Sequence, residues 1–164
     1  MAARLNLAID AAMANKLNKN NRIAVVISAS EPASLGPWQE ALSFGGLHGL
    51  LMIFVSWIKS FPLKTDACAF PAITVAGNDV VAVYRVASEA IAHARKGNGP
   101  TLIECQTNSS DGHSEIGSGN FRDPAEVECW KAGDPILNME KYLIRKGLFS
   151  EEFKKQIAVS LVKS

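Results

Sequence analysis

The chain has 164 residues and a formal net charge of +1, with 48% hydrophobic and 20% charged residues. This length suits one domain with a substantial core, and the balance is ordinary for a globular protein. A net charge so close to zero gives no broad attraction to nucleic acid or to an anionic membrane, so we expect neither as a partner.

The three cysteines, Cys68, Cys105 and Cys129, are odd in number and contain no CxxC pair. This usage predicts neither a disulfide framework nor a zinc site, and it favours a reducing compartment such as the cytoplasm. Cys105 lies in an apolar run and is predicted to be a buried thiol. The longest apolar stretch, residues 49–58, has about half of the ~20 residues that a membrane span needs, which favours a buried strand.

The first half of the chain predicts two helices and two strands. Apolar residues recur at helical spacing over 3–18, and β-branched residues dominate the strand expected at 22–28. A second helix is expected from Pro37 to about residue 48, because proline is tolerated at a first helical position. The apolar run then predicts a strand over 50–57.

The second half continues the alternation. A strand at 71–76 is followed by a helix that Asn78 is expected to cap, with Asp79 near its positive end and Gly97 as its stop. The fourth strand is expected at 101–107. A long loop follows, and Asp-Pro pairs then mark helix starts. The three helices expected after this loop cover 124–131, 135–146 and 150–162.

Strands that alternate with helices predict an α/β fold: a parallel sheet of about four strands with helices on both faces, followed by a helical C-terminal tail. We expect a single domain over 1–164, with its parts at 22–107 (core), 108–123 (loop) and 124–164 (tail). Such sheets bind ligands outside the carboxyl ends of their strands. Any site should therefore lie where the loops after the four strands gather.

Common catalytic motifs are missing from the sequence. It contains no GxGxxG, no GxxxxGK[ST], no GxSxG and no HExxH. The histidines are far apart, so they show no metal-ligand spacing. We interpret His48 and His93 as structural residues of helices, whereas His113 lies in the Gly/Ser-rich loop, where a functional role and a surface position are equally expected.

Several stretches resemble a known family: PAITVAGNDVVAVYRVASEAIAHARKGNGPTLIECQT, GHSEI, FRDPAEVECW and YLIRKGLFSEEF. They are similar to the alpha subunit of the thiamine-diphosphate-dependent 2-oxo acid dehydrogenases, the decarboxylating component of the pyruvate, branched-chain and acetoin dehydrogenase complexes. Residues 22–55 resemble the cofactor-binding strand–helix–strand of that family less closely. The resemblance implies a thiamine-diphosphate-binding fold, thiamine diphosphate with magnesium as cofactors, a beta subunit as partner, and oxidative decarboxylation as the activity.

The sequence departs from this family where the cofactor would be held. The resemblance implies that an Asp after the first strand and an Asn after the second bind Mg²⁺, and that an Arg binds the diphosphate. These positions carry Ser30, Lys59 and Ser109. A lysine ammonium opposes a dication, and the loss of the arginine removes a bidentate phosphate contact. Glu31 offers an alternative carboxylate beside Ser30, at the cost of a shifted backbone.

Two further family residues are retained in Gly112-His113-Ser114. The resemblance implies that His113 lines the active site as an acid/base or positioning residue. It also implies that Ser114 corresponds to a regulatory phosphorylation site of some relatives.

We therefore expect a truncated and diverged relative that lacks the family's N-terminal portion, binds neither cofactor nor metal, is inactive alone, and forms a homo-oligomer. Two alternatives stay open. One is an active alpha-subunit-like enzyme that works with a beta subunit. The other is a non-catalytic module that binds a small ligand or an anion at the same loops.

Overall fold

The computed structural model describes residues 2–28, 35–58, 70–107 and 134–162. Residues up to Gly77 and Val81–Asn108 make up one compact unit, and Asn78–Val80 with Ser109–Ser164 make up a second. The helices and strands in chain order are α1 (Ala2–Leu17), β1 (Ala24–Ser28), α2 (Leu35–Leu47), β2 (Met52–Ile58), β3 (Ala72–Ala76), α3 (Val80–Arg95), β4 (Thr101–Gln106), α5 (Pro135–Arg145) and α6 (Glu151–Val162).

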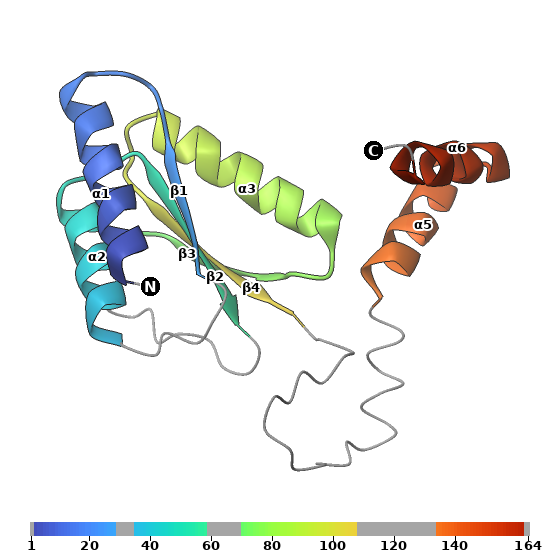
Figure 1. Ribbon diagram of the computed structural model, residues 1–164, viewed down its shortest axis with the longest axis horizontal. Helices are drawn as coiled ribbons and strands as arrows, with labels where there is room; N and C mark the ends of the chain where they lie inside the picture. Colours follow the sequence, from blue (N-terminus) through green and yellow to red (C-terminus); the bar gives the residue numbers. More distant parts are fainter. Residues whose placement is uncertain (1, 29–34, 59–69, 108–133, 163–164) are drawn as a thin grey trace, which may run out of the picture. The chain divides into compact units, whose positions relative to one another are not determined.

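The first unit is built on a four-stranded sheet in the order β1-β2-β4-β3, and every neighbouring pair is parallel. Figure 1 shows α1 and α2 on one face of this sheet and α3 on the other. The predicted α/β fold with a parallel sheet covered on both faces is confirmed. All four predicted strands are present among the described residues.

The face of the sheet under α1 and α2 carries the larger core. Side chains that alternate along the strands meet the apolar sides of both helices, and Gly45 lets α2 approach closely. A Cβ added at Gly45 would lie 3.2 Å from the Phe54 ring. The buried members of this core are Leu5, Ala12, Val26, Trp38, Ala41, Leu42, Leu50, Met52, Phe54 and Leu102.

The opposite face is covered by α3, whose Ala90 packs with Ile53, Val75 and Ile103 from three strands. Edge strand β1 receives less cover on this face. Ile27 is 67% exposed and Val25 is 54% exposed. Parallel sheets are ordinarily covered on both sides, so these two side chains form an uncovered apolar strip on the β1 edge.

The first residues of two helices differ from the prediction. The second helix begins at Leu35, so Pro37 lies within its first turn, where an N–H is still not needed. The third helix begins at Val80, which places Asp79 rather than Asn78 immediately before it. Leu17, the last residue of α1, is 74% exposed. The helix predicted at 124–131 lies outside the described residues.

The second unit contributes two helices joined by a short turn. Asp134 caps α5 as predicted: its Oδ1 accepts from the N–H groups of Ile136 at 2.7 Å and Leu137 at 3.0 Å. The Nζ of Lys154 on α6 donates to Glu140 on α5 at 2.8 Å. Within the described ranges of the chain, no helix is both long and apolar enough to cross a membrane.

Candidate functional site

The carboxyl ends of the four strands lie at one edge of the sheet, because all strands run in the same direction. This is the edge at which the sequence places a site. The residues expected to make it all lie outside the described residues, so their grouping stays a prediction: Ser30, Glu31, Lys59, Ser109, His113 and Ser114.

The described part of this edge carries a row of polar side chains. Ser28, Ser56, Glu104 and Thr74 are aligned by the strand register, each opposite the next across β1, β2, β4 and β3. They follow the apolar core residues by two positions along their strands, so they point to the same face, the one under α1 and α2. The core on this face therefore ends in a polar boundary towards the carboxyl edge.

Glu104 is the charged member of the row and is only 2% exposed. Thr74 Oγ1 donates a hydrogen bond to Glu104 Oε2 at 3.1 Å. Ser56 on the other neighbouring strand is also 2% exposed and stands directly opposite Glu104. Burying a carboxylate is costly unless donors surround it, so this position favours hydrogen-bond donors or a cation and disfavours anions.

The strand ends beside this row are held closely together. Trp57 Nε1 donates to Thr107 Oγ1, which ties the end of β2 to the end of β4. Gly77 N–H donates to Gln106 O at 2.7 Å. A Cβ at Gly77 would lie 2.5 Å from Thr107 Cγ2, so only glycine allows β3 and β4 to approach this closely.

Trp38, in the first turns of α2, lies on the same face of the sheet. Its ring meets Phe54 edge-to-face, with 5.8 Å between ring centroids, and Phe54 in turn stacks on Phe70. The Trp38 Nε1–H is buried and has no hydrogen-bond partner among the described residues. A buried indole N–H usually has a partner, so this donor marks a place where another group is expected.

The remaining residues that the sequence singled out are structural. Cys105 is half-buried on the α3 face rather than fully buried, and this burial raises the pKa of its thiol, which disfavours the reactive thiolate. His93 is a partly exposed helix residue, as predicted. His48 follows the end of α2, where its ring centroid lies 4.2 Å from that of Phe44 and its carbonyl accepts from Lys16 Nζ.

Sequence reasoning missed Glu104, Ser56 and Trp38. A signal for Glu104 is present in the sequence, because a charged residue in the middle of the apolar strand TLIECQ is unusual for a buried parallel strand. Ser56 gives no such signal on its own, because serine is unremarkable in a strand. Its importance depends on lying opposite Glu104, which only the register reveals.

In the described ranges, no three His, Cys, Asp or Glu side chains come close enough to hold a metal ion. The described edge therefore offers one buried carboxylate, several hydroxyls and an indole N–H.

A parallel sheet covered on both faces defines the class of α/β domains. Comparison with known proteins narrows this class. The family "Dehydrogenase E1 component" matches residues 56–164, which is more than half of the chain. The chain belongs to this family.

Three relatives illustrate the match. The chain is 32% identical to a 3-methyl-2-oxobutanoate dehydrogenase subunit alpha of Mycobacterium tuberculosis, over 92% of this chain and 45% of the relative. It is 32% identical to a pyruvate dehydrogenase E1 component subunit alpha of Acholeplasma laidlawii, over 96% of this chain and 50% of the relative. It is 44% identical to the chloroplastic pyruvate dehydrogenase E1 component subunit alpha-3 of Arabidopsis thaliana, over 74% of this chain and 32% of the relative. The chain thus spans half or less of the length of these curated relatives. The family match confirms the resemblance inferred from the sequence.

Proposed function

We propose that this chain is a 2-oxo acid dehydrogenase alpha-subunit-like protein that does not bind thiamine diphosphate with Mg²⁺ and does not catalyse oxidative decarboxylation by itself. The observation that carries this proposal is the set of side chains at the positions where the family would hold the cofactor. Serine, lysine and serine stand there at 30, 59 and 109 in place of Asp, Asn and Arg.

The chemistry of these donors does not fit the cofactor. A hard dication prefers several oxygen ligands, whereas Lys59 brings a positive charge. Each lost charge-assisted hydrogen bond removes about 1.5–3 kcal/mol. The loss of one such contact together with two metal ligands weakens binding by several kcal/mol, which is several powers of ten in affinity. The described edge does not make up for them, because it adds Glu104 but no cluster of metal ligands.

The names of the relatives support the rest of the proposal. They are alpha subunits, so we propose that a beta subunit is a partner of this chain and that a partner is needed for any activity. We also propose a cytoplasmic location and assembly with further copies of the same chain. His113 and Ser114 are proposed as the retained parts of the ancestral site, in an acid/base or positioning role and a regulatory role.

Isothermal titration calorimetry with thiamine diphosphate and Mg²⁺ tests this proposal directly. The unchanged chain should give no binding heat at micromolar protein. The triple variant Ser30→Asp/Lys59→Asn/Ser109→Arg restores the family's side chains and should gain binding heat. Micromolar binding by the unchanged chain would overturn the proposal, and a silent triple variant would show that these three positions are not what prevents binding.

The polar row favours a second candidate function, binding of a small ligand at the carboxyl edge. The buried carboxylate of Glu104, and the Trp38 indole N–H that has no partner among the described residues, suit a ligand that carries both amine or hydroxyl donors and an acceptor. The same carboxylate argues against the anion-binding form of this alternative. The first proposal predicts no binding of thiamine diphosphate, whereas this second one predicts binding of an uncharged or cationic small ligand at the carboxyl edge.

A further inference from the structure

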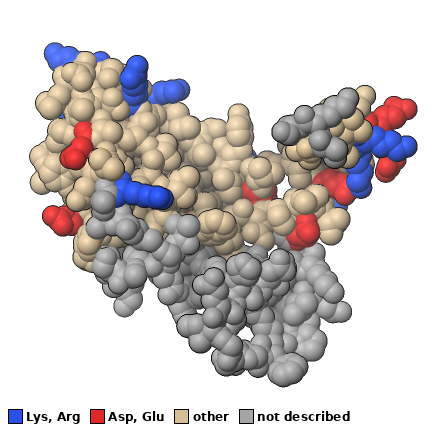
Figure 2. Space-filling view, in the orientation of Figure 1, with Lys and Arg blue, Asp and Glu red and all other residues tan. Residues whose placement is uncertain are grey.

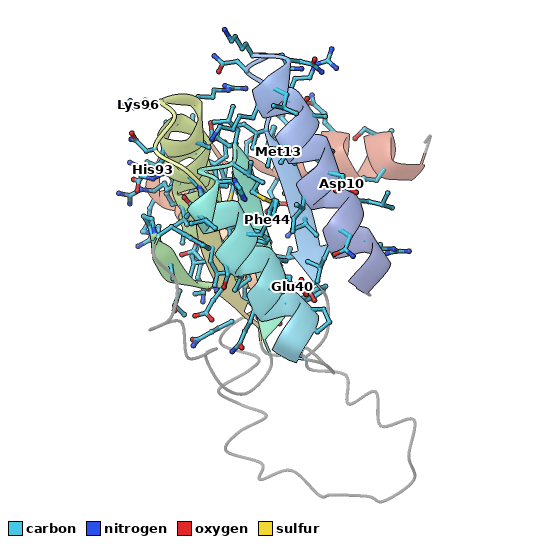
Figure 3. The ribbon with its side chains drawn as sticks, turned by 90° about the vertical axis from the view of Figure 1, so that its left-hand side faces the viewer. Asp10, Met13, Glu40, Phe44, His93 and Lys96 are labelled. Carbon is cyan, nitrogen blue, oxygen red and sulfur yellow. The ribbon has the colours of Figure 1, made fainter. Side chains whose placement is uncertain are left out.

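The amino-terminal edge of the sheet, opposite the candidate site, brings three chain turns together. Lys16 Nζ at the end of α1 donates to the carbonyl of His48 at the end of α2. A Cβ added at Gly99, after α3, would lie 3.8 Å from Gly49 Cα. Figure 3 shows the C-terminal ends of α1, α2 and α3 at the same end of this unit, with Lys96 labelled just after α3.

Positive charge gathers at these turns without negative charge. We call this surface the basic end and define it by its five cations: Lys16, Lys19, Arg22, Arg95 and Lys96. The segments that form it, residues 14–24, 45–52 and 93–101, contain no Asp or Glu. Figure 2 shows Lys and Arg atoms at the upper left, over the end of α1, with no Asp or Glu atoms among them.

The nearest carboxylates along the helices lie well back from the basic end. Asp10 precedes Lys16 by six residues, and Glu89 precedes Arg95 by the same number. At 1.5 Å per residue this is about 9 Å along each axis, close to the distance over which salt screens charges. Among the residues that the structure describes, none of the five cations forms an ion pair.

Exposed apolar and amide groups lie between the cations. Leu17 at the end of α1 is 74% exposed, and Leu47 at the end of α2 is 83% exposed. Asparagine side chains, which both donate and accept hydrogen bonds, occur in the same segments at positions 15, 18, 20, 21 and 98. The surface thus combines positive charge, two leucines and groups that can pair with a peptide backbone.

Stabilisation of the helices accounts for only part of this pattern. Cations near helix C-termini offset the negative end of the helix dipole, which explains Lys16, Arg95 and Lys96. Lys19 belongs to the turn that closes α1, but Arg22 lies five residues beyond the helix and has no helix end to offset. The dipole also gives no reason for the two exposed leucines.

We propose that the basic end is a docking surface for an acidic segment of a partner protein, one whose carboxylates alternate with apolar side chains. Complementary charge would steer and orient the segment, and the leucines would receive its apolar side chains. The segments forming the basic end contain no Phe, Tyr or Trp. The adjacent Phe44 ring is 37% exposed but packs on the His48 ring, so these segments offer no row of the stacking platforms that single-stranded nucleic acid uses.

Fluorescence anisotropy with a labelled peptide of alternating Glu and Leu residues tests this proposal on the whole chain. The unchanged chain should bind the peptide saturably, and binding should weaken as salt rises to about 0.15 M. Arg22→Glu/Lys96→Glu should weaken binding about tenfold, because two attractions become repulsions. The matched control Lys141→Glu/Lys155→Glu makes the same charge change on exposed positions of α5 and α6 and should leave binding unchanged.

A second variant tests the apolar part of the surface. Leu17→Ser/Leu47→Ser keeps all five cations and should also weaken binding. The proposal fails if the unchanged chain does not bind the peptide, or if the control pair weakens binding as much as the test pair. It also fails if phosphatidylserine vesicles or single-stranded DNA bind more tightly than the peptide and lose binding in Arg22→Glu/Lys96→Glu.

Discussion

Glu104 is the residue at which the core and the candidate site meet. Its carboxylate is 2% exposed and accepts from Thr74 at 3.1 Å, so it depends on the donors around it. We expect Glu104→Ala to lower the free energy of unfolding by about 2–4 kcal/mol, because it leaves a cavity and deprives buried donors of their acceptor. Urea denaturation followed by circular dichroism measures this loss.

Glu89→Ala provides the matched control for this change. Glu89 is exposed on α3, where alanine is a good helix former, so the expected change is within about 0.5 kcal/mol. Equal urea midpoints for the two variants would show that the contacts of Glu104 do not stabilise the fold as the structure indicates.

At the scale of elements, the close packing of α2 depends on two adjacent glycines, Gly45 and Gly46. A Cβ at Gly46 would lie 2.8 Å from the Phe70 ring, whereas a Cβ at Gly36 meets nothing within 4 Å. Gly46→Val should therefore destabilise the protein by about 1–3 kcal/mol through overpacking. Gly36→Ala should be neutral or stabilise it by up to about 1 kcal/mol, because alanine favours the helix. Thermal denaturation of both variants measures the contrast, and similar melting temperatures would contradict the close approach of α2.

The elements themselves could be predicted because their signals are local. The strands AVVIS and TLIECQ are short β-branched or apolar runs, and Asp134-Pro135 marks a helix start in adjacent residues. The polar row could not be predicted. Ser28, Ser56 and Glu104 are distant in sequence, and their alignment depends on which strands pair and in which register. The family resemblance supplied candidate positions at the loops instead, and those positions lie outside the described residues.

At the scale of the whole molecule, the first unit has its candidate site and its basic end at opposite edges of one sheet. The carboxyl edge carries the buried Glu104, and the amino edge carries the basic end. A partner bound at the amino edge would therefore leave the carboxyl edge open. The two proposals can be tested independently, because the variants for one edge do not touch the other.

The exposed apolar strip on β1 bears on self-association. Val25 and Ile27 are more than half exposed on an edge strand, and such strands are ready templates for pairing with another chain. We expect a homo-oligomer in which the β1 edges of two copies meet, since antiparallel pairing of one strand with its own copy satisfies two-fold symmetry. Analytical ultracentrifugation over a range of concentrations should show a species larger than the monomer.

Ile27→Lys should shift this equilibrium towards the monomer, because a charge on an edge strand opposes pairing. Ile144→Lys is the control, since Ile144 is 56% exposed on α5 and gives the same change of side chain away from the sheet. A monomer at every concentration would contradict self-association. Dissociation by Ile144→Lys with no effect of Ile27→Lys would place the interface on the helices of the second unit instead of on β1.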